Sequence, residues 1–539
     1  MTLCVTCCSL YKAFRFERGQ HRHQAQFRQL YSSAVSSTNQ QAITVVVQVR
    51  HFSNMMLGKS VPEYIFIKVA IAALRLIAPL SMLCVAWMLL VVPASTDPDP
   101  KWGLFYSCLR IYAPLEAAFF LCVYLPRRYH LQKTAKHPRL SREERQALFT
   151  RCSAWQGSAN YPSGWFFHSR NFHRKNVLEW LLWALFSTSM NAHREEWEDE
   201  IVGYLTTVEN VLGQELPDGY NKDTPCMRLT LDPVPMLHRP LLWYLIIGVI
   251  DFVTCLRLYS LGFRHYGDKR MFQSFPPRPL TLFSRPSSIE GVSYWYLPHR
   301  SLTKSPILFL HGIGIGLFPY TSFLADLAVQ HPDVGIIVPE FLSISSRITS
   351  PPLSRNATLD ALRHILDAHS LARVVIAAHS YGTVIAAQLF RCPDLATRVT
   401  ATLLVDPIPF LLHLPDVAYN FVYRAPRTAN EWLLWYFACR DPDVSRTISR
   451  HFFWTENILW KEDLQDKVVA VALCGQDQVV NAEEVRKYLT GEDEKKANWT
   501  GGRLEVLCYP ELDHAMIFNV RRRWGRLVRV LDRFVRELN

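Results

Sequence analysis

The chain lacks the patterns that mark several protein classes. Its 13 cysteines follow no regular spacing, which argues against a disulfide framework and a zinc site. The glycine-rich stretch 311–316 runs into the bulky residues 317–320, so a dinucleotide-binding helix is not expected there. The net charge of +12 is spread along the chain, which disfavours a nucleic-acid partner and suits anionic lipid headgroups. No metal or cofactor is therefore expected.

Acidic residues are almost absent from segment 1–60. Glu17 is its single acid, against basic residues at positions 12, 15, 18, 22, 28, 50 and 59 and many Ser and Gln. This composition is typical of an organelle transit peptide or of a disordered extension. It also fits untranslated upstream sequence, if Met55 or Met56 is the start. Mitochondrial import is the less favoured of these interpretations.

A serine between a strand pattern and a helix pattern is the most informative feature of the chain. The apolar run 374–379 predicts a buried strand, and the small-residue run 384–390 predicts a helix. Ala378 and Gly382 occupy the two positions that must be small if strand and helix are to pass closely. The pattern predicts that Ser380 is a nucleophile exposed on a strained turn.

Two backbone donors for an oxyanion are expected near this serine. The run 306–310 predicts a strand, and it ends in the glycine-rich loop 311–316. An acyl-transfer site needs one N–H group from the residue after the nucleophile and one from such a loop. We assign these donors to Tyr381 and Ile313. An ordinary flexible turn is the alternative interpretation of the loop.

An acid and a base follow later strand patterns. Asp477 comes just after the apolar run 468–474, and His514 follows the run 504–509. A serine hydroxyl needs a base to take its proton, and the base needs a carboxylate to orient it. The order Ser380, Asp477, His514 is therefore expected to form a catalytic triad.

Asp406 is a second candidate for the acid. It ends the predicted strand 400–405 and precedes Pro407. An aspartate before proline at a strand end is often a structural turn residue, so Asp477 is preferred. Both assignments stay open at this point.

Together these motifs resemble the α/β-hydrolase superfamily over residues 278–539. The resemblance implies a mostly parallel sheet of about eight strands flanked by helices, with the site at the carboxyl ends of the strands. Segments 281–284 and 291–297 would form an opening antiparallel pair, and 335–339 the next strand. Because the nucleophile position holds serine, where dehalogenases and epoxide hydrolases of this superfamily use aspartate, an acyl-serine intermediate is expected.

The resemblance also places a helical lid in segment 407–466. This segment is rich in aromatic and aliphatic residues, including the run Trp432–Phe437. An apolar lid favours a lipid-like ligand over a sugar or a peptide. The alternative is that these side chains form the lid's own packing core.

Segment 61–130 predicts a membrane hairpin with one or two spans. Residues 76–93 are uncharged and apolar, at the lower length limit of a span, whereas 103–125 contains Arg110 and Glu116. These two charges must pair, or face the first helix, to be tolerated in lipid. Basic residues lie at both outer ends of the hairpin (Lys68, Arg75, Arg127, Arg128, Lys133 and Lys136) and aspartates in its turn. The hydrolase domain is therefore expected to face the cytosol.

Residues 131–277 are expected to form a helical accessory region. Ser141 and Glu144 match a capping box. The apolar stretch 240–256 is interrupted by Asp251 and predicts a helix lying in the membrane interface or against the hydrolase domain, with spanning as the minority alternative.

The leading hypothesis is a membrane-anchored serine hydrolase that cleaves a carboxylic ester of a lipid-like substrate. A thioesterase, an amidase or a peptidase is an alternative, because a triad does not encode the leaving group. A catalytically silent hydrolase fold used as a membrane scaffold is a further alternative. The acyl chain, the headgroup and the organelle are not encoded in these motifs.

Overall fold

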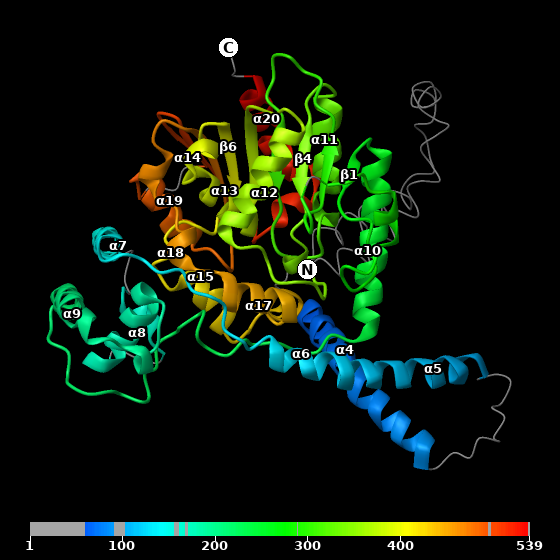
Figure 1. Ribbon diagram of the computed structural model, residues 1–539, viewed down its shortest axis with the longest axis horizontal. Coiled ribbons are helices and arrows are strands. Elements are labelled where there is room, and N and C mark those ends of the chain that lie inside the picture. Colours follow the sequence, from blue (N-terminus) through cyan, green and yellow to red (C-terminus); the bar gives the residue numbers. More distant parts are fainter. Residues whose placement is uncertain are drawn as a thin grey trace, which may run out of the picture.

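The computed structural model describes residues 60–90, 103–155, 161–167, 171–287, 289–493 and 497–536. The basic extension up to residue 59 and the polar turn 95–101 of the hairpin lie outside the described residues. Figure 1 shows a central sheet with helices on both faces, a lobe formed by α7, α8 and α9, and two helices, α4 and α5, that extend away from the sheet.

A sheet of nine strands forms the core of the molecule. The strands are β1 (Arg264–Tyr266), β2 (Tyr294–Leu297), β3 (Ile307–Leu310), β4 (Ile336–Pro339), β5 (Val374–His379), β6 (Val399–Val405), β7 (Val468–Cys474), β8 (Asn498–Gly501) and β9 (Leu504–Tyr509). Their order across the sheet is β1-β2-β4-β3-β5-β6-β7-β9-β8. The block from β4 to β9 is parallel, and β1, β2 and β8 pair antiparallel. The expected mostly parallel α/β-hydrolase fold is confirmed.

The helices of the first half are α4 (Val61–Leu90), α5 (Gly103–Phe119), α6 (Leu125–His130), α7 (Arg142–Ala154), α8 (Arg174–Phe186), α9 (Glu198–Leu212) and α10 (Leu241–Ser260). Those of the second half are α11 (Thr321–Gln330), α12 (Arg355–Ala368), α13 (Tyr381–Phe390), α14 (Pro393–Ala396), α15 (Asp416–Ala418), α16 (Ala429–Leu434), α17 (Pro442–His451), α18 (Trp454–Asn457), α19 (Ala482–Thr490) and α20 (Arg521–Arg536). Buried side chains of α12, α13 and α19 pack on one face of the sheet, and those of α11 and α20 on the other.

The start of the sheet differs from the expectation. Segment 281–284, predicted as the first strand, lies in a 3-10 turn over Pro279–Phe283. Its place is taken by β1, which pairs antiparallel with β2 and lies before residue 278. Pro279 favours a turn because it cannot donate a ladder hydrogen bond. The edge strand β8 was also not predicted, and the sheet has nine strands where about eight were expected.

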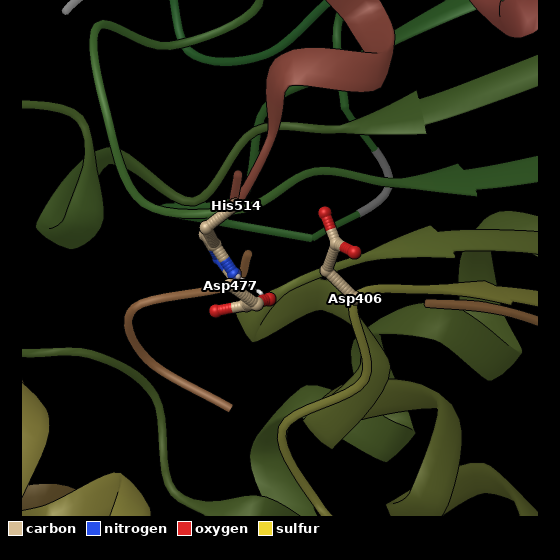
Figure 2. Close-up of side chains that lie close together, drawn as sticks. All are labelled: Asp406, Asp477 and His514. Carbon is tan, nitrogen blue, oxygen red and sulfur yellow. Dashed lines mark hydrogen bonds and ion pairs between the residues drawn. The ribbon is translucent and has the colours of Figure 1, made fainter. Parts of the chain in front are cut away.

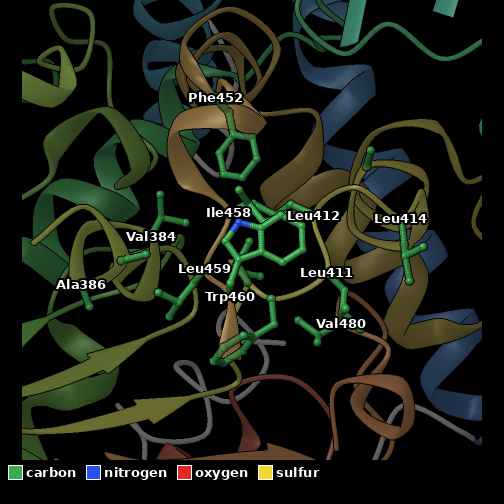
Figure 3. Packing of buried hydrophobic residues seen from close by; sticks show 14 of the residues in the cluster. Val384, Ala386, Leu411, Leu412, Leu414, Phe452, Ile458, Leu459, Trp460 and Val480 are labelled. Atoms are coloured by element: carbon green, nitrogen blue, oxygen red, sulfur yellow. The ribbon is translucent and has the colours of Figure 1, made fainter. Parts of the chain in front are cut away.

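The lid is continuous with the core of the domain. Figure 3 shows Phe452, Leu459 and Trp460 of the lid packed near Val384 of α13. Leu459 is fully buried and Trp460 nearly so, so these two belong to the packing core. Other apolar residues of the lid line a cavity described below. Some of the lid's apolar side chains therefore form its packing core, and others suit the ligand-binding interpretation.

Polar contacts stabilise the accessory lobe, which is formed by α7, α8 and α9. The sequence predicts only some of these contacts. The predicted capping box is present, with Ser141 and Glu144 each bonded to the other's backbone. Arg145 of α7 forms a buried two-pronged contact with Glu200 of α9, at 2.6 and 2.9 Å. Such a paired geometry compensates the cost of burying both charges.

The two helical segments of the predicted hairpin are long and apolar enough to cross a membrane. By length and composition Val61–Leu90 and Tyr106–His130 qualify, and so does Leu241–Ser260. Ile67 and Ile71 of α4 pack against α16 of the lid, and Lys68 lies 3.4 Å from the centre of the Trp432 ring. The apolar helix α4 therefore contacts the lid directly.

The charges in the second segment do not pair with each other. Arg110 is exposed, whereas Glu116 is fully buried and accepts hydrogen bonds from the hydroxyl of Tyr112 and the N–H of Leu241. The same carboxylate lies 2.8 Å from Nε2 of His238. The partner of Glu116 thus comes from the start of α10, more than a hundred residues away, which sequence spacing could not indicate.

Helix α10 packs one face against the hydrolase domain. Asp251, which interrupts its apolar run, is paired with Arg278 at 3.0 Å and with Arg347 at 2.9 Å. The opposite face exposes apolar residues at helical spacing, including Leu245 and Val249. The helix therefore packs one face on the domain and presents an apolar face outward, and whether it spans a membrane or lies in its interface stays a prediction.

Candidate active site

Ser380 lies on the sharp turn between β5 and α13. Its backbone has φ 51° and ψ −121°, a conformation that L-residues seldom adopt. The turn is held by a hydrogen bond from the N–H of Ser380 to Val405 O and by one from the N–H of Thr383 to Ser380 O. The strained geometry that the sequence predicts for a nucleophile is thus present in the structure.

The structure brings Ser380, His514 and Asp477 into one hydrogen-bonded chain. Oγ of Ser380 lies 2.8 Å from Nε2 of His514, and Nδ1 of the same ring lies 2.6 Å from Oδ2 of Asp477. The other oxygen of Asp477 accepts the N–H groups of Val479 and Val480, which fixes the carboxylate. This is the geometry that nucleophile, base and orienting acid require.

Asp406 lies nearby but is not bonded to His514. It is fully buried, and its two oxygens accept the N–H groups of Cys474 and Ala515 at 3.0 and 2.9 Å. Figure 2 shows Asp477 against the ring of His514 and Asp406 to one side. Burial raises the pKa of Asp406, but His379, His514 and the N–H of Ala515 bring it below its usual value. Asp406 is therefore a buried carboxylate that braces the loop carrying His514.

Asp406, Asp477 and His514 offer oxygen and nitrogen atoms within 4.8 Å of one another, a spacing that a metal ion could also use. The hydrogen bonds described above already account for the positions of all three side chains. The ring atom of His514 facing Asp477 is bonded to it, and the ring atom on the other side contacts Ser380. The cluster fits a proton-transfer system without a metal.

Carboxylates dominate the electrostatics of His514. Burial lowers the pKa of the imidazole, but the charge and hydrogen bond of Asp477 raise it, with smaller contributions from Asp406 and Asp513. The net result is a pKa above the ordinary value. A base strengthened in this way is suited to take a proton from a serine hydroxyl.

The two assigned oxyanion donors flank the serine. Among the described residues, the N–H groups of Tyr381 and Ile313 have no hydrogen-bond acceptor. The loop before Ile313 approaches the nucleophile closely, because a Cβ on Gly312 would lie 2.8 Å from Cβ of Ser380. The N–H of Gly312 is held by the hydroxyl of Tyr320. Both donors are thus free to bind a carbonyl oxygen at this site.

The positioning role of Tyr320 was not predicted from the sequence. Its hydroxyl also lies 2.8 Å from Nδ1 of His379, the residue before the nucleophile. Tyr320 therefore links the oxyanion loop to the strand that carries Ser380. The only hint of this role in the sequence is the position of Tyr320 just after the glycine-rich loop, where its size alone argues against a dinucleotide-binding helix.

An apolar cavity of about 90 Å³ opens beside the serine. Ser380, Tyr381, Ile313 and His514 lie at its wall. Residues of the lid that line it include Phe421, Leu434, Ile448, Phe452 and Trp454. Among the described residues, none that lines it is Asp, Glu, Lys or Arg. The cavity suits an uncharged, apolar ligand.

The accessory region contributes a wall of the same cavity. Its residues there are Trp165, Trp183, Ala184, Ser187, Leu229 and Thr230. No pattern in the sequence indicates this role, because these positions precede the hydrolase motifs and carry only the apolar residues expected of helical packing. The candidate site is therefore built from both halves of the chain.

A mostly parallel sheet with a serine on the turn after β5, a histidine after β9 and an acid after β7 defines an α/β-hydrolase domain. Residues 307–529 match the family model described as the alpha/beta hydrolase family. The matched segment, which begins at β3 and ends within α20, is similar to the α/β-hydrolase superfamily. No curated protein matches the sequence.

Solved structures of hydrolases resemble the chain at low sequence identity. A carboxylesterase of the thaumarchaeon Nitrososphaera gargenis is 14% identical, covers 45% of this chain and 95% of its own, and has a TM-score of 0.30. An esterase of Thermogutta terrifontis is 12% identical, with 47% and 97% covered and a TM-score of 0.33. A bacterial membrane phospholipase A is 13% identical, with 62% and 97% covered and a TM-score of 0.34.

Proposed function

We propose that the chain is a membrane-anchored serine hydrolase that cleaves a carboxylic ester of a lipid-like substrate. The observation that carries the proposal is the hydrogen-bonded chain Ser380–His514–Asp477 at the wall of an apolar cavity. Similarity to the α/β-hydrolase superfamily agrees with this chemistry but does not define the substrate.

In the first half of the reaction, Oγ of Ser380 attacks the ester carbonyl while Nε2 of His514 takes the hydroxyl proton. The N–H groups of Tyr381 and Ile313 stabilise the negative charge that develops on the carbonyl oxygen. When the C–O bond breaks, His514 returns its proton to the departing alkoxide. The products of this step are an alcohol and an acyl-serine.

In the second half, water replaces the alcohol. His514 takes a proton from the water as its oxygen attacks the acyl-serine carbonyl, and the same oxyanion donors act again. Breaking the bond to Ser380 releases a carboxylic acid, and His514 returns the proton to Oγ. Asp477 stabilises the imidazolium in both halves without itself taking up a proton.

The lining of the cavity supports an apolar acyl group as the ligand. Burying each CH2 group of a chain in such a site contributes about 0.8 kcal/mol. A sugar or a charged peptide would leave its polar groups without partners there, at a cost of about 1–3 kcal/mol for each group. The substrate class that this cavity favours is a fatty ester or another lipid ester.

The apolar helices support membrane attachment. α4 exposes large apolar side chains such as Leu83, Trp87 and Leu89 to its surroundings, which in water would be a large unfavourable patch. A bilayer removes that cost. The basic residues at both ends of the hairpin favour a cytosolic position for those ends and for the hydrolase domain.

Labelling with a fluorophosphonate probe tests the enzymatic function. We expect the full-length protein to be labelled and the Ser380→Ala variant to lose the label entirely, because the probe reacts only with an activated serine. Ser187→Ala is a matched control, since Ser187 lines the same cavity but is not bonded to a base. An unlabelled wild type, or labelling that survives in Ser380→Ala, would support the silent scaffold instead.

The orientation can be tested with the chain's own glycosylation sequons. Asn356 and Asn498 are exposed residues of the hydrolase domain, in Asn-x-Thr sequences. We expect no glycan on either when the protein is expressed in eukaryotic cells, because both should face the cytosol. A sequon introduced into segment 91–102 should be glycosylated if the hairpin spans. A glycosidase-sensitive mass shift at Asn356 or Asn498 would contradict the cytosolic orientation.

A further inference from the structure

A second apolar cavity lies directly behind the catalytic one. It is a small gap of about 10 Å³, lined by residues of the accessory lobe that include Phe149, Cys152 and Leu181. Four residues line both cavities: Trp165, Trp183, Ala184 and Trp454. These four residues, called the partition below, separate the catalytic cavity from the space inside the accessory lobe.

Hydrogen bonds fix the indole rings of the partition. Nε1 of Trp183 donates to Oγ1 of Thr230 at 3.1 Å, and Nε1 of Trp165 donates to His413 O at 2.9 Å. Nε1 of Trp454 donates to Ala184 O at 3.1 Å. The rings of Trp165 and Trp183 also contact each other, with centroids 5.1 Å apart.

These bonds leave the partition rigid and apolar. Each buried indole N–H is satisfied, so the ring faces can line both cavities without an unpaired polar group. Each ring is also held in one orientation, because a rotation would break its hydrogen bond. Two of the bonds, those of Trp165 and Trp454, join the accessory lobe to the lid segment 407–466. The partition is therefore a fixed wall between two cavities.

We propose that the partition ends the acyl-binding part of the catalytic cavity and thereby sets the length of the acyl chain that is hydrolysed. The gap in the accessory lobe is too small for an acyl chain while the partition is intact, and it becomes a distal acyl subsite only when a ring of the partition is removed. This inference rests on the proposed ester hydrolysis, because it assigns the catalytic cavity to the acyl group. It gives the accessory region a role in specificity.

Removing one ring should open the distal subsite. In Trp183→Ala, the end of a longer acyl chain can pass the partition and be buried among apolar side chains. Each additional buried CH2 group is worth about fourfold in binding. For an ester two CH2 groups longer than the best wild-type substrate, we expect kcat/KM to rise by roughly 15-fold relative to that of the wild type. The measurement is kcat/KM across p-nitrophenyl esters of increasing chain length.

A second variant shifts the preference in the opposite direction. Ala184→Leu adds bulk to the partition on a helix that accepts leucine well. We expect the acyl-chain length at which kcat/KM is highest to become shorter than in the wild type. This variant keeps the inference testable if Trp183→Ala fails to fold.

Filling the distal subsite provides the matched control. Cys152 lines only the small cavity of the two, and Cys152→Leu reduces its space. In the Trp183→Ala background, this change should remove most of the gain on longer chains. A gain that persists in the double variant would mean that the chain end lies elsewhere.

The outcomes separate this inference from the function on which it rests. If the wild type hydrolyses no ester and takes no fluorophosphonate label, the proposed function fails and the chain-length role fails with it. If the wild type is active but all variants share its chain-length profile, only the partition inference is overturned. Binding of saturated fatty acids to Ser380→Ala and to Ser380→Ala/Trp183→Ala gives a readout without turnover, and only the double variant should bind longer chains more tightly.

Discussion

Changing Asp477 to asparagine is expected to lower kcat by about four orders of magnitude. The carboxylate accepts the hydrogen bond of His514 Nδ1 at 2.6 Å and raises the pKa of that ring. An asparagine amide that donates to Nδ1 would favour the tautomer with its proton on Nε2, where Ser380 needs an acceptor. Steady-state hydrolysis of a soluble ester measures the loss.

Asp406→Asn is the matched control for this prediction. Asparagine has the same shape as aspartate here too, but the oxygens of Asp406 accept the N–H groups of Cys474, at the end of β7, and Ala515, in the loop after β9, instead of the imidazole. We expect a loss of about tenfold or less, since one of the two N–H bonds can be retained. A larger loss for Asp406→Asn than for Asp477→Asn would exchange the roles of the two acids.

The pH dependence of kcat/KM is an independent test of Asp477 as the partner of His514. His514 acts as a base only when neutral, and Asp477 is the main group that raises its pKa, against the effect of burial. The acidic limb of kcat/KM should therefore lie above the ordinary histidine value of about 6.5, with activity lost as the pH falls through it. In Asp477→Asn the limb should move to lower pH, and Asp406→Asn should move it by less. An unshifted limb in Asp477→Asn would argue against this carboxylate as the partner of His514.

The strands and loops of the hydrolase domain could be predicted because they leave local marks in the sequence. A buried parallel strand is typically marked by a continuous apolar run, and β5 and β7 each show one. The candidate site residues Ser380, Asp477 and His514 come soon after the ends of β5, β7 and β9, so the strand ends also indicate where to look for them. Short antiparallel edge strands carry no such mark, which is why β1 and β8 were missed.

Contacts between distant segments could not be predicted in this way. Glu116 contacts His238, and Trp183 lines the cavity beside Ser380, which lies almost two hundred residues later in the chain. Neither contact produces a period or a spacing in the sequence. The environment of Ala378 also becomes clear only in the sheet, where its small methyl group is buried in the apolar core.

Gly382, in contrast, has no room for a methyl group. A Cβ at this position would lie 2.2 Å from Leu310 O and 2.5 Å from Leu310 C, both atoms of the β3 backbone. Backbone in the centre of a sheet cannot move aside cheaply, so α13 and β3 would have to separate. We expect Gly382→Ala to lower the free energy of unfolding by about 3 kcal/mol or more.

Gly382→Ala should also disturb the oxyanion site in the fraction of the protein that still folds. β3 leads directly into the loop that carries Ile313, so a displaced Leu310 shifts one of the two assigned donors. The loss of one such donor costs about 10²–10³ in kcat. Denaturant unfolding, together with the turnover of the folded fraction, separates the two effects.

Gly203→Ala is the matched control for the loss of stability. Gly203 lies within α9, and a Cβ there would meet nothing within 4 Å. Alanine should stabilise this helix by up to about 1 kcal/mol, because it restricts the unfolded chain more than glycine does. If Gly382→Ala were as stable as the wild type, strand β3 and helix α13 could not approach as closely as the turn at Ser380 requires. The geometry assigned to the nucleophile would then be wrong.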